Sequence, residues 1–426
     1  MTEPATAAQR TGVVRSLGVV TAGSLVANAL AYLVQWPASR ELGPEGYGEF
    51  SVLLAALLVI AVPALALQNV VARETVLGAS RAALWRLITT VALIVTALSI
   101  VAAPFLAALA GTSVTSTFAA TAAAGPLVVV SGAQGLLQGA GRFGLLGVVL
   151  AAVGVLRSAP VIVTVLTGGG AGAALAAGTA GTVVAAVGVG LLATPTRLEP
   201  RTLLEPFDFV PSQVERNPAR GGVGVQTVLF ASGVQLVIIV AVSLDLLLSR
   251  TVLDASAAGT YALGAVATKA AFWLPQAVGV VVYPRLADPI TSRRALGAAA
   301  RVLAVIGAVV TAAAAVAGPL VPAIVSEDYR PVAGLIWLFA LTGALLSLLQ
   351  LLLLAAVARD RARGAIPALG VLLIETALIL TVAHSVLSLV LIAAGCAAAA
   401  VVLTALWGRS AAAGPSVEPG AAPTAG

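Results

Sequence analysis

The chain has 426 residues, of which 60% are hydrophobic and 9% are charged, and its formal net charge is +6. An ordinary soluble domain carries about 25% charged residues, so this composition excludes a soluble globular protein and predicts one that crosses a membrane many times. In such a chain a positive net charge reflects orientation in the membrane, and we expect no nucleic-acid partner.

Two side chains that often build metal or redox sites are nearly absent. Cys396 is the only cysteine and His384 the only histidine, which excludes an intramolecular disulfide and a His/Cys metal centre. A phosphate-binding loop requires a lysine after a run of glycines, and the only lysine, Lys269, lies inside an apolar stretch. We therefore expect no metal, no cofactor and no ATP-driven pump in this chain.

The apolar residues form runs long enough to cross a bilayer, for which about 20 residues are needed. Breaks at charged residues and at Gly/Pro-rich turns divide the chain into about twelve spans. These predicted spans are 16–39, 50–70, 84–109, 117–140, 144–166, 172–194, 224–249, 258–283, 298–322, 332–357, 366–384 and 386–408. The pattern predicts an all-α polytopic membrane protein.

Three segments are predicted to lie outside the membrane on the cytoplasmic side. Residues 1–15 precede the first span, and residues 409–426 form an Ala/Gly/Pro-rich tail that we expect to be disordered. Residues 195–223 carry five prolines among charged residues, which makes them a hydrophilic linker. The linker separates an N-terminal lobe, 16–194, from a C-terminal lobe, 224–408.

The arginines predict the orientation, because cytoplasmic segments near spans are enriched in Lys and Arg. With the N-terminus inside, eighteen arginines fall on the cytoplasmic side and only Arg40, Arg250 and Arg330 on the outer side. We therefore expect a multi-pass protein of the cytoplasmic membrane with both termini in the cytoplasm.

A hairpin in the first half of the chain has a counterpart in the second half. Residues 40–73 run from an arginine through a Gly/Tyr turn and a proline to a second arginine, and residues 250–285 repeat that order. Each predicted lobe has six spans, an even number, so the repeats enter the membrane from the same side. Such parallel repeats are related by an axis along the membrane normal and place a substrate site between the lobes.

The first hairpin also carries a family resemblance. Its tip, Leu42–Gly48, reads LGPEGYG, and its second span ends at Ala66–Glu74 with ALQNVVARE. Together with Val242–Leu248, Ala258–Leu263 and Tyr283–Leu286, these stretches resemble the polysaccharide-biosynthesis branch of the multidrug/oligosaccharidyl-lipid/polysaccharide (MOP) flippase superfamily. The likeness covers essentially the whole apolar part of the chain.

The resemblance implies a two-lobe, V-shaped, MATE-like transporter that works by alternating access. In that branch the substrate is an oligosaccharide on a lipid, typically a polyprenyl pyrophosphate. Twelve spans rather than fourteen argue against the peptidoglycan-precursor members, which have two extra helices.

Four ionisable residues within predicted spans are the first candidates for function, because a charge at the bilayer centre costs about 2.5–3.5 kcal/mol even on mild scales. Arg157 could bind a pyrophosphate or an acidic sugar, or cap carbonyls and pair with a carboxylate. Lys269 could neutralise the phosphates, or form an ion pair with Glu375. Asp245 and Glu375 could couple transport to a proton or sodium ion or gate it, and Asp245 could instead pair with Arg250 on its own helix.

Neutral polar residues in spans form a second group, for which interhelical hydrogen bonding is the alternative to lining a sugar path. We place Asn28, Gln134 and Gln235 with Arg157 and Lys269 in the predicted substrate site. The other members of the group are Gln35, Gln138, Gln276 and Gln350.

The predicted function is translocation of a polyprenyl-(pyro)phosphate-linked oligosaccharide or related glycolipid across the cytoplasmic membrane. Its expected partners are that glycolipid, membrane lipids and, functionally, glycosyltransferases, and we expect a monomer. A drug or metabolite antiporter of the same superfamily is the alternative. A membrane glycan polymerase or ligase would need a large external loop, and the external loop at residues 40–50 is short, so we expect no enzyme.

Overall fold

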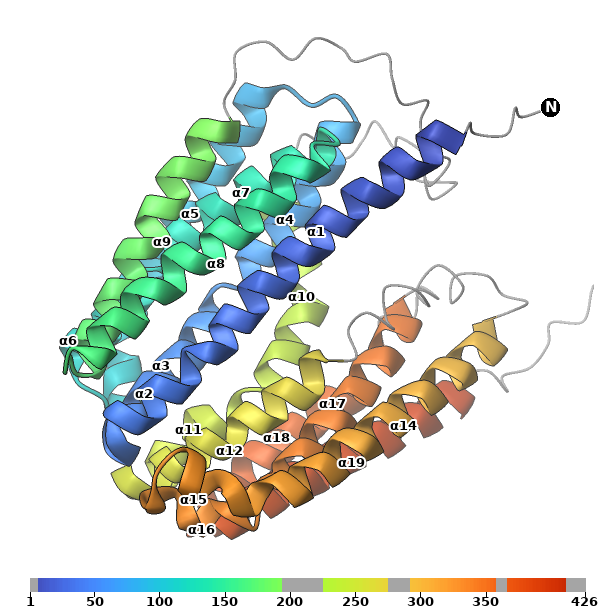
Figure 1. Ribbon diagram of the computed structural model, residues 1–426. Helices are drawn as coiled ribbons and strands as arrows, with labels where there is room; N and C mark the ends of the chain where they lie inside the picture. Colours follow the sequence, from blue (N-terminus) through green and yellow to red (C-terminus); the bar gives the residue numbers. More distant parts are fainter. Residues whose placement is uncertain (1–6, 194–224, 275–291, 358–365, 411–426) are drawn as a thin grey trace, which may run out of the picture. The chain divides into compact units, whose positions relative to one another are not determined.

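The computed structural model describes the whole chain except residues 1–6, 194–224, 275–291, 358–365 and 411–426 (Figure 1). The described residues are almost entirely helical and include no strand. The helices of the first half are α1 (Ala7–Leu33), α2 (Gln35–Glu41), α3 (Gly43–Ile60), α4 (Val62–Val76), α5 (Arg81–Ala110), α6 (Val114–Thr121), α7 (Ala124–Gly139), α8 (Phe143–Leu166) and α9 (Ala171–Ala193).

The second half begins with α10 and contains several short segments between the long helices. Its helices are α10 (Val225–Ala241), α11 (Leu244–Val252), α12 (Ala255–Trp273), α14 (Ser292–Ala317), η1 (Gly318–Leu320), α15 (Val321–Ile324), η2 (Glu327–Tyr329), α16 (Arg330–Ala333), α17 (Ile336–Val357), α18 (Ile366–Val382) and α19 (Val386–Ser410). The predicted linker 195–223 and nearly all of the predicted tail lie outside the described residues.

The described helices confirm a membrane protein with many spans. Nine helical segments in the described part of the chain are long and apolar enough to cross a membrane, and the pair α10–α11, bent by 41°, makes a tenth. The predicted spans 258–283 and 366–384 correspond to α12 and to the shorter apolar helix α18. An all-helical architecture is the expected one, since a backbone in lipid must satisfy its hydrogen bonds within the segment.

Several predicted spans are broken into two helices. The second span divides at Ala61, and Pro63 lies in the first turn of α4, where its missing N–H costs nothing. By contrast, Pro104 and Pro160 lie inside the continuous helices α5 and α8. Proline therefore breaks only some of the spans that contain it.

Local sequence explains where α5 and α6 begin and end. Ser80 caps α5 by accepting from the Ala83 N–H (3.3 Å), and Ser113 caps α6 by accepting from the Ser116 N–H (3.0 Å). Glu49 of α3 accepts from the Ser113 N–H at 3.0 Å. Gly111 ends α5 in the left-handed region with φ 58°, a conformation that glycine adopts without strain.

The chain divides into two compact units. The first contains Met1–Ile239 and Asp254–Ala262, and the second contains Val240–Leu253 and Leu263–Gly426. These units differ from the predicted lobes, because the N-terminal part of α12 belongs to the first unit and α11 belongs to the second. The lobe boundaries at 16–194 and 224–408 therefore stay a prediction.

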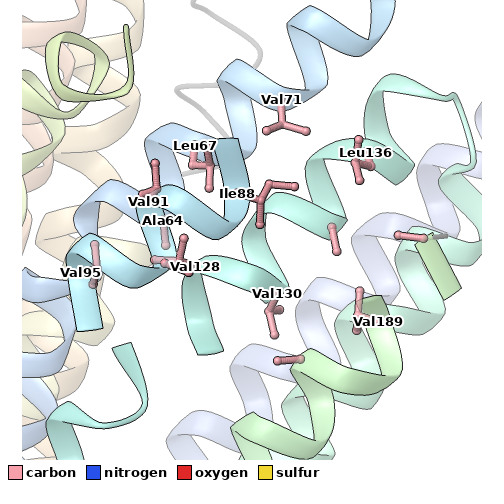
Figure 2. Close-up of a cluster of buried hydrophobic side chains, with 14 of the residues drawn as sticks. Ala64, Leu67, Val71, Ile88, Val91, Val95, Val128, Val130, Leu136 and Val189 are labelled. Atoms are coloured by element: carbon pink, nitrogen blue, oxygen red, sulfur yellow. The ribbon is translucent and has the colours of Figure 1, made fainter. Parts of the chain in front are cut away.

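The first unit is built around an aliphatic core in which α4, α5, α7 and α9 meet (Figure 2). Leu67 and Val71 come from α4, Ile88 from α5 and Leu136 from α7, and all are at most 5% exposed. Glycines bring α7 close to α4: a Cβ at Gly135 would lie 2.5 Å from the Gln68 carbonyl oxygen. In lipid such small residues allow close helix packing, which drives association.

Helix α1 packs against α8 through the same kind of contact. A Cβ on Gly23 would lie 2.0 Å from the Gly147 carbonyl oxygen, and one on Gly154 would lie 2.6 Å from the Ala27 Cα. On α9, a Cβ at Gly181 would lie 1.8 Å from the Leu156 carbonyl oxygen. Helix α8 is thus held on two sides by backbone contacts that only glycine permits.

The two hairpin tips singled out in the sequence meet within the first unit. A Cβ at Gly259 would lie 1.8 Å from the Pro44 carbonyl oxygen. Tyr47 and Tyr261, which occupy matching places in the two tips, are both completely buried. The repeated Gly and Tyr residues therefore serve packing.

The second unit is held by α14, α17, α18 and α19, which pack side by side. Helix α12 joins α17 through the Thr268 hydroxyl, which donates to the Phe339 carbonyl at 3.0 Å. Gly343 makes this close approach possible, since a Cβ there would lie 2.1 Å from the Thr268 carbonyl oxygen.

Candidate functional site: charges within the spans

Arg157 lies deep in α8, in the first unit. It follows Phe143 by fourteen residues, which is about 21 Å at 1.5 Å per residue. Its neighbours Gly154 and Leu156 are the contact points of α8 with α1 and α9. The position of Arg157 is therefore fixed by two glycine-mediated helix contacts.

The Arg157 side chain is partly buried and has no ionic or hydrogen-bonding partner among the described residues. Arginines elsewhere in the described chain do form ion pairs, such as Arg73–Glu74 (3.8 Å) and Arg330–Glu327, both with exposed arginine side chains. The alternative in which Arg157 pairs with a carboxylate is thus not realised within the described chain. A guanidinium at this depth has five donors available for a ligand or for water.

Three other charged residues gather in the second unit. Asp245 stands in the first turn of α11 and Glu375 in α18, and they are 5% and 6% exposed. Lys269 of α12 is partly buried. Asp245 is close enough to interact electrostatically with both Lys269 and Glu375.

This arrangement differs from the pairings weighed from the sequence. Lys269 and Glu375 do not form an ion pair in the described part of the chain, and each has Asp245 as its charged neighbour. Asp245 also accepts a hydrogen bond from the Leu246 N–H at 2.7 Å. Asp245 is therefore a charged neighbour of both Lys269 and Glu375.

A break in the seventh span positions Asp245. Helix α10 ends at Ala241, α11 begins at Leu244, and the axes differ by 41°. Ser243 lies between them, fully buried, and its hydroxyl has no hydrogen-bond partner. Sequence reasoning missed Ser243, although a serine two residues before an aspartate in an apolar run was a usable signal.

The neutral polar candidates are dispersed. Asn28 of α1 is exposed, Gln134 of α7 is 6% exposed, and Gln235 of α10 is partly buried. Gln35 accepts from the Tyr47 hydroxyl at 2.9 Å, and the Gln68 amide donates to Gln138 at 3.3 Å. Gln350 is partly buried in α17, and Gln276 lies outside the described residues. Gln35 and Gln138 thus form hydrogen bonds between helices, which is the alternative to lining a sugar path.

The Gln68–Gln138 contact allows a direct measurement. Interhelical hydrogen bonds of this kind contribute about 0.6 kcal/mol on average in membrane proteins. We expect a double-mutant cycle of Gln68→Leu and Gln138→Leu, followed by unfolding in mixed micelles, to give a coupling energy of about that size. Strictly additive effects would show that the contact contributes nothing.

Comparison with known proteins finds similarity in structure only. No protein-family model matches the chain, and no curated protein matches it by sequence. The lipid II flippase MurJ in an inward closed conformation aligns over 92% of this chain and 87% of its own, with a TM-score of 0.70 and 10% identity.

Two further structures agree with that result. An inward-facing multidrug resistance MATE transporter of the MOP superfamily aligns over 91% of this chain and 94% of its own, with TM-score 0.65 and 18% identity. A MOP superfamily transporter from Pyrococcus furiosus aligns over 93% and 95%, with TM-score 0.55 and 16% identity. The chain thus has the fold shared by these transporters, which confirms the predicted fold class.

Proposed function

We propose that the protein is a flippase that moves a polyprenyl-(pyro)phosphate-linked oligosaccharide, or a related glycolipid, across the cytoplasmic membrane for the synthesis of cell-surface polysaccharide. The observation that carries the proposal is Arg157, a guanidinium inside an apolar helix with no partner among the described residues. Charged groups within spans mark substrate or ion pathways. A lipid-linked pyrophosphate is the ligand of matching charge.

The chemistry of the guanidinium favours a phosphate over a cation. Its planar N–H groups bind two oxygens of a phosphate or carboxylate at once, and such bonds are strongest where water is excluded. Lys269 would add a second positive group, as the sequence predicted. Asn28, Gln134 and Gln235 stay candidates for hydrogen bonds to the sugar.

The ionic part of the proposal concerns Asp245 and Glu375. Both carboxyls are buried in helices of the second unit, and acids within membrane spans mark ion pathways and proton relays. We propose that they couple the transport cycle to an ion gradient. With the topology predicted from the arginines, the glycolipid would be loaded from the cytoplasmic leaflet after glycosyltransferases complete it.

An antiporter of cationic drugs or metabolites is the second candidate, favoured by the acids Asp245 and Glu375 and by the MATE-like fold. Transport assays in proteoliposomes distinguish the flippase from the antiporter. A fluorescent polyprenyl-pyrophosphate disaccharide should cross the bilayer faster with the protein than in empty vesicles, whereas ethidium should not be transported. Ethidium export without glycolipid movement would overturn the proposal and support the antiporter.

The coupling role of Glu375 can be tested in the same vesicles. We expect Glu375→Gln to abolish the response of glycolipid movement to an imposed proton gradient, because an amide cannot exchange a proton. Glu327→Gln is the matched control, since Glu327 is exposed and pairs with Arg330. An unchanged response in Glu375→Gln would rule out this role.

A further inference from the structure

One side of α1 is polar along most of its length. Its polar residues follow one another at intervals of three or four, which places them on one face of a helix with 3.6 residues per turn. They are Thr21, Ser24, Asn28 and Tyr32, and Gln35 of α2 continues the series. The side chains of Thr21, Asn28 and Tyr32 are exposed. We call this face the polar side of α1.

The polar side of α1 is poorly suited to contact with lipid. An amide or a hydroxyl in an apolar medium is unfavourable unless it forms a hydrogen bond, and the Asn28 amide forms none within the described chain. Where the series ends, Gln35 accepts a hydrogen bond from the Tyr47 hydroxyl of α3 at 2.9 Å, and Tyr47 is completely buried. This side of the segment therefore faces the interior of the first unit.

The polar side of α1 lies at the same level as Arg157. Helices α1 and α8 lie side by side (Figure 1), and their glycine contacts pair increasing residue numbers on both, so the two helices run in the same direction. From the contact between Ala27 and Gly154, Asn28 is one residue farther along α1 and Arg157 is three farther along α8. At 1.5 Å per residue their levels differ by about 3 Å. Tyr32 is about 3 Å beyond Arg157 by the same measure, so Arg157 lies between them.

Arg157 and Asn28 also point to the same side of the α1–α8 pair. With about 100° per residue, Arg157 is rotated by about 60° in one sense from Gly154, and Asn28 by about 100° in the other sense from Ala27. Because the helices face each other at Gly154 and Ala27 and run in the same direction, opposite rotations lead to the same side.

The other side of the α1–α8 pair is apolar. Val26 precedes Ala27 and Val155 follows Gly154, so both valines are rotated away from Arg157 by the same argument. Their exposed fractions are 44% and 45%, as expected for side chains that contact lipid. The pair therefore has one side for lipid and one side that carries Arg157 and the polar residues.

Sugar hydroxyl groups fit the polar side of α1. An amide and a phenol hydroxyl each donate and accept hydrogen bonds, as sugar hydroxyls do, and residues 18–33 include no charged residue. In a glycolipid of the proposed kind the first sugar is bonded directly to the pyrophosphate. A pyrophosphate bound to Arg157 would therefore bring that sugar to the level of Asn28 and Tyr32.

We propose that the polar side of α1 is a sugar-binding surface, in which Asn28 and Tyr32 form hydrogen bonds with the sugars next to a pyrophosphate bound to Arg157. The inference rests on the proposed function and deepens it, because it assigns the phosphate and the sugar to different side chains. It also adds Tyr32 to the residues that contact substrate.

Binding to the purified full-length protein in detergent tests this assignment. The two probes are a polyprenyl-pyrophosphate disaccharide and the same polyprenyl pyrophosphate without sugar. Asn28→Leu and Tyr32→Phe should each weaken binding of the disaccharide about threefold to tenfold, because each loses a neutral hydrogen bond, and should bind the sugar-free lipid like wild type. Arg157→Ala should weaken binding of both probes. Val26→Ala, on the apolar side, is the matched control and should bind both like wild type.

Labelling with a water-soluble maleimide tests the surroundings of the polar side even where Asn28→Leu fails to fold. In a Cys396→Ala background, Asn28→Cys should react in proteoliposomes, and the disaccharide lipid should slow that reaction at least about fivefold. Val26→Cys should stay unreactive. An unreactive Asn28→Cys would overturn the inference, because lipid or protein would then cover the polar side. A reaction that the disaccharide lipid does not slow would overturn it too, since the polar side would then contact water alone.

The failure of this inference is distinguishable from that of the proposed function. Full affinity of Asn28→Leu and Tyr32→Phe for the disaccharide, or an equal loss for both probes, would overturn the sugar-binding surface and leave the flippase proposal intact. If wild type bound neither probe, the proposed function would fail and the inference with it.

Discussion

Replacing Arg157 by alanine is expected to slow glycolipid translocation about tenfold to a hundredfold. A hydrogen bond to a charged group contributes about 1.5–3 kcal/mol, and the loss of this energy from the transition state lowers the rate by about that factor. The variant should still insert in the membrane, since the substitution removes a charge from an apolar helix. Translocation in proteoliposomes, corrected for the amount of folded protein, measures the effect.

Two variants serve as controls for this experiment. Arg157→Lys keeps the charge but loses the bidentate geometry, so we expect an intermediate rate. Arg330→Ala also removes an arginine, but one whose side chain is 72% exposed and paired with Glu327, and its rate should equal that of wild type. Wild-type translocation by Arg157→Ala would remove the basis for the proposed substrate.

The variant Gly181→Val is expected to lose both stability and transport. A Cβ at this position would lie 1.8 Å from the Leu156 carbonyl oxygen, so α9 must move away from α8. Overpacking costs about 1–3 kcal/mol in well-packed interiors, and here the obstructing atom belongs to the backbone and cannot rotate away. Because Leu156 precedes Arg157, the shift should also displace the guanidinium.

Gly188 provides the matched control on the same helix. A Cβ there would meet nothing within 4 Å, so Gly188→Val should unfold in mixed micelles at nearly the wild-type denaturant concentration. Equal stability of Gly181→Val and Gly188→Val would show that the folded protein tolerates a side chain at the close α8–α9 contact without loss of stability.

The span pattern could be predicted because its cause is local. A bilayer requires long apolar stretches with internally satisfied backbones, and charges and Gly/Pro turns mark their ends. All twelve predicted spans overlap described helices, including the weakly apolar α12. The positions of the helix breaks at Ala61 and Ser243 were not predicted, because the presence of a proline does not show where a span breaks.

The sequence predicted which residues belong to the candidate site, but not which of them are neighbours. That Arg157, Lys269, Asp245 and Glu375 matter follows from the cost of a charge in lipid, which depends on the residue and its span. Which charges are neighbours depends on how helices pack, so the predicted alternative of a Lys269–Glu375 pair was replaced by a group centred on Asp245.

The sequence by itself thus determined that this is an all-helical membrane protein of many spans and which ionisable residues lie inside them, because hydrophobicity and charge act along each segment separately. Only the tertiary structure decided that Arg157 has no partner among the described residues, that α8 is held by Gly154 and Gly181, and that Asp245 links Lys269 to Glu375. These features depend on distances between residues far apart in the chain, which helix packing sets.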